Sequence, residues 1–214
     1  MALAVARPDG EPPNTRRAAT PEVIIDVAER LWGDRGIDAV SLREISTAAG
    51  LSNPASVQYH FGDKNGLVWA IFVSRLPALD RRRGRMLQRL RRAGPLTDAA
   101  ALFDCLFRPL FEQKNAEGRR SYAAFLNRLL LDASWTELRG KAMAMTPATD
   151  ELVEAIHALK PSLDLETKNV RMIACNALVL SLICRADRER HPVAMAEAAF
   201  RDSVGMAAAA YLAN

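Results

Sequence analysis

The chain has 214 residues, half of them apolar and a quarter charged, a composition that excludes an intrinsically disordered protein. No apolar run approaches the roughly 20 residues of a membrane-spanning helix, and residues 1–15 lack the basic start and apolar centre of a secretory signal. The net charge of +4 does not by itself indicate that the protein binds nucleic acid. Residues 16–64 contain six basic and seven acidic side chains, whereas the segment from Arg75 to Arg92 contains eight arginines and one aspartate.

The first predicted helix follows a flexible, proline-containing tail at residues 1–15. Thr20 is a candidate cap, Pro21 occupies the first helical position, and Glu22 places an acid in the first turn. Apolar residues then recur at helical spacing from Val23 to Leu31. Gly36 is a natural C-terminal stop.

A second, short helix is predicted to begin at Ser41. Ser41 and Glu44 have the spacing of a capping box, in which each side chain accepts a hydrogen bond from the backbone N–H of the other residue. Leu42, Ile45 and the alanines at 48 and 49 supply an apolar face, and Gly50 ends the helix.

A third helix is predicted from Pro54 to His60, capped by Asn53 and bounded by Gly62. Seven residues form a rod of roughly 10 Å, which is short enough to lie in a major groove. Two short helices joined by a tight turn that contains glycine are typical of a helix-turn-helix, here residues 42–61.

Longer helices are predicted beyond Gly66. We expect a helix over 67–76, a break or kink at Pro77, and helices over 79–92, 98–115, 119–131, 136–145, 147–159, 166–188 and 193–212. No strand-like alternation is long enough for a sheet. The fold class is therefore all-α, with a DNA-binding domain at residues 16–65 and a larger helical regulatory and dimerisation domain at residues 66–214.

The last two helices carry the strongest association pattern. The helix over 166–188 has a 3-4-3-4 apolar spacing and a second apolar stripe, so it is buried on two sides. The final helix repeats the pattern, and two such helices from each of two copies predict a homodimer with a four-helix interface. The alternative is that both serve only the core of one copy. The predicted interface residues are Val170, Ile173, Ala177, Leu180, Cys184, Phe200, Val204, Ala207 and Tyr211.

The segment Ser41–Phe72 resembles the DNA-binding segment of TetR (tetracycline-repressor-like) regulators. The resemblance rests on Ile45, the Ala48-Ala49-Gly50 run, the Tyr59-His60-Phe61 run, Lys64 and Leu67. It covers about the first third of the chain. Beyond that third, only the length and the helical pattern agree with the family.

The resemblance implies a role for each matching residue. Tyr59, His60 and Lys64 are expected to contact phosphates, while Asn53, Ala55, Ser56 and Gln58 face base edges. Gln58 stands where many members have an aromatic residue, so its contact is either a phosphate or, by a bidentate amide, an adenine. Arg43 on the second helix either contacts phosphate or pairs with a nearby acid.

The family also implies a transcription regulator, a repressor that binds a palindromic operator in double-stranded DNA and is released by a small apolar or amphipathic ligand. The cytoplasm is the expected compartment, because no secretory signal is recognised and the odd number of cysteines has no metal-ligand spacing. The candidate ligand-binding residues are Phe103, Phe107, Phe125, Trp135, Met172 and Asn176. Aromatic and methionine stripes of this kind are more often plain core, whereas Asn176 either binds the ligand or sets the register of the dimer.

The alternatives are a ligand-independent DNA-binding protein and a helical enzyme that binds a small molecule. The three histidines lack spaced partners, so we expect no catalytic residue, metal or cofactor. The cysteines, Cys105, Cys175 and Cys184, are expected to be buried thiols in a reducing compartment, and no membrane partner is expected.

Overall fold

The computed structural model describes residues 20–213 except positions 54 and 131, and none of these residues lies in a β-strand. The predicted all-α fold class is confirmed. The predicted tail, the first four residues of the predicted DNA-binding domain (16–19), and Pro54 lie outside the described residues. The helices are α1 (Pro21–Arg35), α2 (Leu42–Ala48), α3 (Ser56–Phe61), α4 (Lys64–Ala93), α5 (Ala99–Glu112), α6 (Ser121–Leu130), α7 (Thr136–Met143), α8 (Pro147–Ala158), α9 (Leu165–Arg188) and α10 (Val193–Leu212), with a 3-10 turn at Ala133–Trp135.

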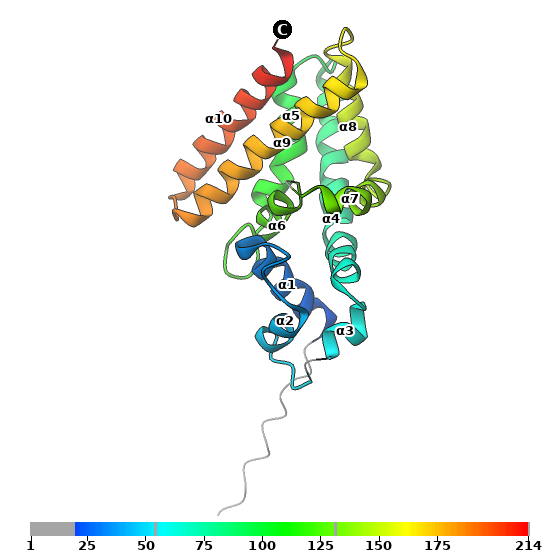
Figure 1. The fold of residues 1–214 in the computed structure, drawn as a ribbon. Helices are drawn as coiled ribbons and strands as arrows, with labels where there is room; N and C mark the ends of the chain where they lie inside the picture. Colours follow the sequence, from blue (N-terminus) through cyan, green and yellow to red (C-terminus); the bar gives the residue numbers. More distant parts are fainter. Residues whose placement is uncertain (1–19, 54, 131, 214) are drawn as a thin grey trace, which may run out of the picture.

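The helices form a small end and a larger body (Figure 1). The small end consists of α1, α2, α3 and the beginning of α4. In the body, α4 and α5 pack against each other and against α8, while α9 and α10 lie side by side and contact α5 and α6. The small end joins the body in two ways, through the continuous helix α4 and through the packing of α1 along α6.

Of the two outcomes predicted at Pro77, a break or a kink, the break is wrong, because α4 is one continuous helix of 30 residues. A proline inside a helix removes one backbone hydrogen bond and costs about 3 kcal/mol. Leu79 and Leu87, both buried in the common core, lie on the same helix beyond the proline. Their packing against neighbouring helices offsets the lost hydrogen bond, which the local sequence does not show.

Helix α9 is long and apolar enough, by length and composition alone, to cross a membrane. A core helix of a globular protein passes the same test. Here Met172, Cys175, Val179 and Ile183 on one side of α9 are buried in the common core, so packing within the chain accounts for much of its apolar character.

The junction between α1 and α6 is closely packed and contains charged groups. A Cβ atom at Gly33 would lie 3.0 Å from the backbone nitrogen of Phe125, so the two helices approach backbone to backbone. The buried Glu29 carboxylate accepts a hydrogen bond from Arg75 Nε at 2.6 Å and another from the Ser121 hydroxyl. The Glu29 carboxylate of α1 thus connects this helix to Arg75 of α4 and to Ser121 of α6.

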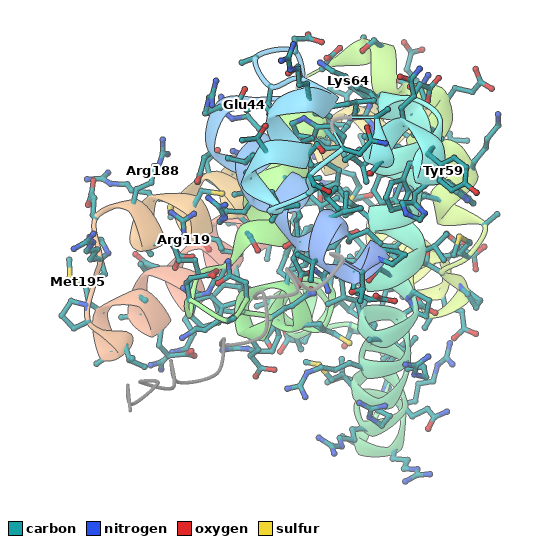
Figure 2. The ribbon with its side chains drawn as sticks, turned by 90° about the horizontal axis from the view of Figure 1, so that it is seen from below. Glu44, Tyr59, Lys64, Arg119, Arg188 and Met195 are labelled. Carbon is teal, nitrogen blue, oxygen red and sulfur yellow. The ribbon has the colours of Figure 1, made fainter. Side chains whose placement is uncertain are left out.

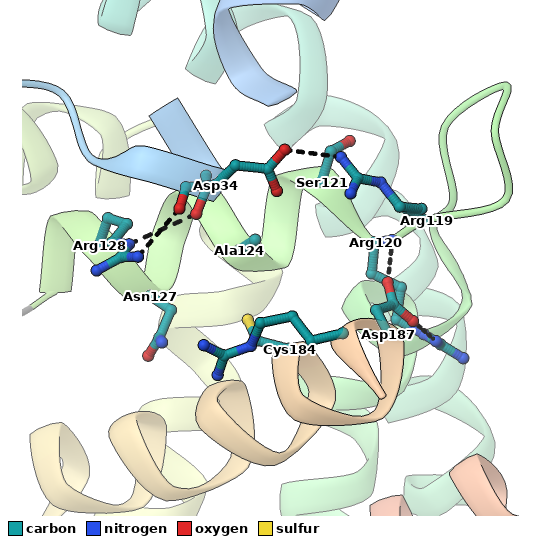
Figure 3. Close-up of a pocket in the computed structure, with 11 residues that line it drawn as sticks. Asp34, Arg119, Arg120, Ser121, Ala124, Asn127, Arg128, Cys184 and Asp187 are labelled. Atoms are coloured by element: carbon teal, nitrogen blue, oxygen red, sulfur yellow. Dashed lines mark hydrogen bonds and ion pairs between the residues drawn. The ribbon is translucent and has the colours of Figure 1, made fainter. Parts of the chain in front are cut away.

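A polar pocket lies beside the same junction, between α1, α6 and α9 (Figure 3). Arg119 pairs with Asp34 at 2.9 Å, and Arg128 donates to the Asp34 carbonyl oxygen at 3.1 Å. On the body side, Arg120 pairs with Asp187 of α9. Charged contacts thus hold the end of α1 to the α6 segment and that segment to α9.

Candidate nucleic-acid interface and internal cavity

Helix α2 is held by caps at both ends. The Ser41 hydroxyl accepts a hydrogen bond from the Glu44 backbone N–H at 3.1 Å, which is one half of the predicted capping box. The other half is corrected, because the Glu44 carboxylate pairs with Arg35 of α1. At the C-terminal end, Gly50 has a φ of +75°, and Leu51 N–H donates to the Ser46 carbonyl oxygen at 3.0 Å. This is the geometry of a Schellman motif.

Helix α3 begins two residues later than predicted, at Ser56, and ends at Phe61. Asn53 acts in the turn before it: its side-chain oxygen accepts from Ala55 N–H at 2.9 Å, and its carbonyl oxygen accepts from the Ser46 hydroxyl of α2 at 3.1 Å. Six residues give a rod of about 9 Å, which still fits within a major groove.

One side of α3 is anchored in the core and the other faces solvent. Val57 is fully buried, whereas Gln58, Tyr59 and His60 are exposed. Tyr59 is 86% exposed, and its ring meets the neighbouring His60 ring edge-on, with the ring centroids 5.4 Å apart. The view in Figure 2, from below, shows Glu44, Tyr59 and Lys64 around the α1–α3 end, far from Met195. Gln58, Tyr59 and His60 thus form an exposed polar and aromatic face of α3.

The turn from α3 into α4 has a requirement that the sequence pattern does not reveal. Asp63 caps α4 by accepting a hydrogen bond from Gly66 N–H at 2.9 Å. A Cβ atom at Gly66 would lie only 1.9 Å from the Phe61 carbonyl oxygen at the end of α3. Glycine at position 66 therefore sets the close approach of the two helices.

The remaining predicted DNA-contacting residues fall into two groups. Arg43, Asn53 and Ala55 are exposed, and Arg43 forms no ion pair with any carboxylate in the described part of the chain. Ser56 and Lys64 are half-buried. The Lys64 ammonium donates to the Ile37 carbonyl oxygen at 2.7 Å, which uses one of its three N–H donors within the protein.

Comparison with known proteins addresses the same segment. The family model described as bacterial regulatory proteins of the tetR family matches residues 24–71, which span α1 to the beginning of α4. These residues are therefore similar to the N-terminal domain of tetR-family regulatory proteins. No significant match is found among curated proteins.

Two solved structures share the fold of nearly the whole chain. One is described as a TetR-family transcriptional regulator from Rhodococcus sp., with 19% identity, a TM-score of 0.54, and coverage of 88% of this chain and 98% of that one. The other is a TetR-family transcription regulator from Marinobacter aquaeolei, with 20% identity, a TM-score of 0.53, and coverage of 89% and 94%. The chain thus combines a segment that matches the tetR-family model with a helical body whose fold is shared by these two structures.

The structure corrects most of the predicted interface residues on the last two helices. Phe200, Val204, Ala207 and Tyr211 of α10 are buried within the chain, and Phe200 stacks on Phe111 of α5 at 4.3 Å. The reason is that α10 is apolar on nearly all sides, and its larger residues fill the chain's own core.

On α9, the same prediction divides between two sides of the helix. Val170 and Ile173 are 61% and 51% exposed, and Ala177 is half-buried. Leu180 is buried, and Cys184 lines the pocket at the α1–α6 junction. The exposed face continues on α10, where Met195 and Met206 are large exposed apolar residues.

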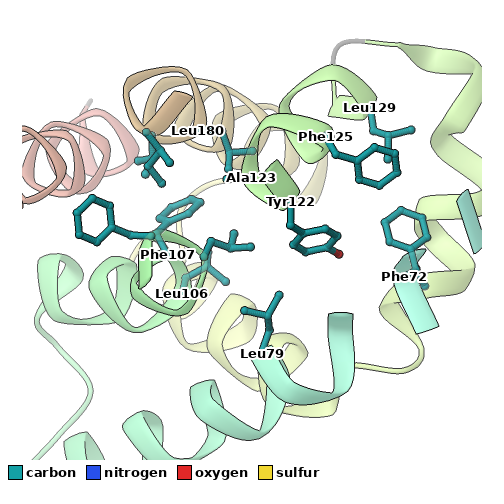
Figure 4. Packing of buried hydrophobic residues seen from close by; sticks show 14 of the residues in the cluster. Phe72, Leu79, Leu106, Phe107, Tyr122, Ala123, Phe125, Leu129 and Leu180 are labelled. Carbon is teal, nitrogen blue, oxygen red and sulfur yellow. The ribbon is translucent and has the colours of Figure 1, made fainter. Parts of the chain in front are cut away.

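A separate cavity of about 200 Å³ lies inside the body, lined by residues of α4 to α9. Three of the predicted ligand-binding residues, Phe107, Met172 and Asn176, line it. Figure 4 shows Tyr122 among the apolar side chains around it, including Leu79 and Leu106.

The other three predicted ligand-binding residues do not line this cavity. Phe103 stacks on Phe107 at 6.2 Å, and Phe125 stacks on Trp32 at 6.3 Å. Trp135 is buried in the 3-10 turn before α7. They are core residues, as aromatic residues on an apolar face usually are. The sequence pattern missed the polar residues of the cavity, Arg83, Tyr122, Arg139 and Thr149.

Cys105 and Cys175 are buried, as predicted, whereas Cys184 is half-buried. All three are free, and burial raises the pKa of Cys105 to about 12 and those of Cys175 and Cys184 to about 11. A thiol with a raised pKa forms little of the reactive thiolate at neutral pH.

Proposed function

We propose that this protein is a sequence-specific transcription regulator, acting as a repressor, whose α3 enters the major groove of double-stranded DNA. The observation that carries the proposal is the exposed face of Gln58, Tyr59 and His60 on the short helix α3. The opposite side of α3 is anchored by the buried Val57, and the neighbouring helix α2 is capped by Ser41. Gln58 then faces base edges, while Tyr59 and His60 donate to phosphates. Arg43 and Lys64 add backbone contacts. The DNA-binding domain extends from residue 16 to about residue 65.

The active species is proposed to be a homodimer. Val170 and Ile173 on α9, with Met195 and Met206 on α10, form an exposed apolar face in the body at residues 66–214. A shallow groove runs along α10 beside Gly205, where a Cβ atom would meet open space, so a partner helix has room to approach closely. Two copies related by a twofold axis place two α3 helices on a palindromic operator.

Release from DNA is proposed to depend on a small molecule in the internal cavity. Tyr122, Leu126 and Leu130 of α6 line this cavity, whereas the opposite side of α6 packs on α1 at Gly33. A ligand that shifts α6 must therefore also shift α1 or break the ion pairs at the junction. Coupling of this kind needs different contacts in the two states.

No catalytic role is proposed. His60 is exposed on α3, His157 stacks on Tyr211, and His191 bonds to Glu189. The cytoplasm is the proposed compartment, which agrees with three free thiols.

The proposal is tested by footprinting the intact protein on the DNA that flanks its own gene. We expect protection of one inverted repeat. Gln58→Ala is expected to weaken binding about fivefold or more through a lost base contact. Tyr59→Ala is expected to weaken it about tenfold through a lost phosphate contact. Gln88→Ala is the matched control, because Gln88 is exposed near the far end of α4, and its affinity should be unchanged.

The salt dependence of DNA affinity tests whether Arg43 contacts a phosphate. If Arg43 contacts phosphate, Arg43→Ala lowers the slope of log affinity against log salt by about one, whereas Arg89→Ala does not. Undiminished binding by the Gln58 and Tyr59 variants in a folded dimer contradicts the assigned DNA surface.

Dimerisation is tested by sedimentation. Ile173→Glu places a charge in the proposed interface and should yield monomers with weak operator binding. Val73→Glu adds the same charge at an exposed apolar residue of α4 and should leave the dimer intact. Monomeric wild-type protein, or an intact Ile173→Glu dimer, contradicts this interface.

A further inference from the structure

The internal cavity combines an apolar wall with cationic groups. Phe72, Leu76, Leu110 and Val153 contribute to the wall, together with the residues named above. Two arginines, Arg83 of α4 and Arg139 of α7, also line the cavity. Arginine is among the residues least often buried without a partner. Two guanidinium groups in a largely apolar cavity therefore require an explanation.

Arg83 is almost completely buried and bonds only to neutral groups. Its Nε donates to the Leu106 carbonyl oxygen at 2.9 Å, and one terminal nitrogen donates to the Thr149 hydroxyl oxygen at 3.0 Å. Thr149 in turn donates to the buried Asp80 carboxylate at 2.7 Å, so Asp80 is linked to Arg83 only through Thr149. Burial lowers the pKa of Arg83 despite the attraction of Asp80.

Arg139, which is half-buried, also lines the cavity and also bonds only to neutral groups. It donates to the Leu129 carbonyl oxygen at 2.6 Å and to the Thr136 hydroxyl at 3.0 Å. Within residues 20–213, excluding 54 and 131, no carboxylate forms an ion pair with either Arg83 or Arg139. Burial also lowers the pKa of Arg139, opposed by the more distant Asp132. The lining thus has two positive charges, and Asp80 already accepts three hydrogen bonds, from Thr149 twice and from Ala148 N–H.

The Tyr122 hydroxyl is a further polar group of the cavity, and unlike the two arginines it has no hydrogen-bond partner among the described residues. Tyr122 is 1% exposed. A buried hydroxyl without a partner loses the hydrogen bonds it would make to water. Tyr122 also lies close enough to Arg83 for the two groups to influence each other electrostatically. A ligand acceptor placed between them satisfies both.

We propose that the cavity binds a small organic acid, whose carboxylate accepts hydrogen bonds from Arg83, Arg139 and the Tyr122 hydroxyl while its apolar part packs on Phe72, Phe107 and Leu110. Arginine is suited to this role because its planar donors match a carboxylate. The volume of about 200 Å³ limits the apolar part, since a cavity of about 150 Å³ holds benzene. The fitting class is a monocarboxylate with one aromatic ring or a short aliphatic chain.

This inference takes its regulatory meaning from the proposed function, but binding is measured without DNA. Calorimetry on the intact protein compares 3-phenylpropionate with the neutral 3-phenylpropionamide, which has nearly the same shape. The acid should bind about tenfold or more tightly than the amide, the usual strength of charge-assisted hydrogen bonds. Equal affinity, no binding of either compound, or tighter binding of the amide overturns the proposal.

Variants assign the preference to the cavity. Arg139→Gln should remove most of the preference for acid over amide, and Arg139→Lys should restore part of it. Arg89→Gln, at an exposed site outside the cavity, should leave the preference unchanged. Arg83→Gln is informative only if circular dichroism shows a folded protein, so Tyr122→Phe is the second variant and should weaken the acid several-fold more than the amide. An unchanged preference in Arg139→Gln and Tyr122→Phe overturns the assignment.

Operator binding is then measured with and without the acid. If calorimetry shows no preference for the acid but the protein still binds its operator, only the proposed ligand class is rejected. Failure of operator binding rejects the proposed function and leaves the measured affinity of the cavity for the acid standing.

Discussion

The small end, which carries the proposed DNA-binding surface, and the cavity in the body differ in how far apart in the sequence their residues lie. The exposed face of α3 and its supports come from about 26 consecutive residues, Ser41 to Gly66, joined by local caps and turns. The cavity is lined by residues from Phe72 to Leu180, contributed by six helices. A local surface is specified by short-range hydrogen bonds, whereas a cavity depends on how distant helices pack.

This difference explains what could be predicted from the sequence. The cap at Ser41 and the glycine stops predicted the order and approximate bounds of α1 to α3, and the helical periodicity located the helices after α4 within a few residues, whereas α4 was predicted as two pieces. Which side of α10 faces inward could not be predicted, because the helix is apolar on almost every side. The arginines of the cavity were also missed, since Arg83 lies in a run of arginines of which most are exposed.

The largest expected effect comes from breaking the contact between the two regions. Glu29→Gln removes the buried carboxylate that pairs with Arg75 and leaves the exposed Asp26 as its remaining ionic partner, and we expect a loss of about 3 kcal/mol in the free energy of unfolding. Chemical denaturation measures this loss. Glu137→Gln removes an exposed i,i+4 pair with Lys141 and should change stability little. Equal effects of the two substitutions contradict a stabilising role for the junction.

The next effect should be confined to the small end. Gly66→Ala forces a methyl group against the Phe61 carbonyl oxygen, so α3 or α4 must move. We expect a loss of about 2 kcal/mol in stability and a clear loss of operator affinity. Gly140→Ala is the control, because its Cβ atom meets open space within helix α7. It should be neutral or stabilising by up to about 1 kcal/mol. Normal operator binding by Gly66→Ala contradicts the steric argument.

The cavity region gives a smaller effect of opposite sign. Tyr122→Phe removes a buried hydroxyl that has no partner in the described chain. Without ligand, the variant should therefore be more stable, by about 1 kcal/mol. Tyr59→Phe, at the exposed aromatic residue of α3, should have no effect on stability. A destabilised Tyr122→Phe protein indicates that the hydroxyl is bonded in solution.

The smallest expected effect depends on pH. Burial lowers the pKa of His157, aided by the nearby Lys168. Below the ordinary histidine pKa of about 6.5, the unfolded chain therefore binds more protons than the folded chain, and stability falls as pH decreases. The wild-type protein should lose more stability between about pH 7.5 and pH 5.5 than His157→Gln. Parallel pH profiles of the two proteins exclude this contribution.

The unbroken course of α4 past Pro77 makes the helix a lever. Thirty residues form a rod of about 45 Å. A tilt of about 5° around its midpoint moves each tip by about 2 Å, so symmetric tilts in two copies change the separation of their tips by up to about 4 Å. In the proposed dimer, a change of about 4 Å is roughly a tenth of the spacing of about 34–36 Å between successive turns of DNA, so a small tilt of α4 in the body alters how the two α3 helices match the proposed operator.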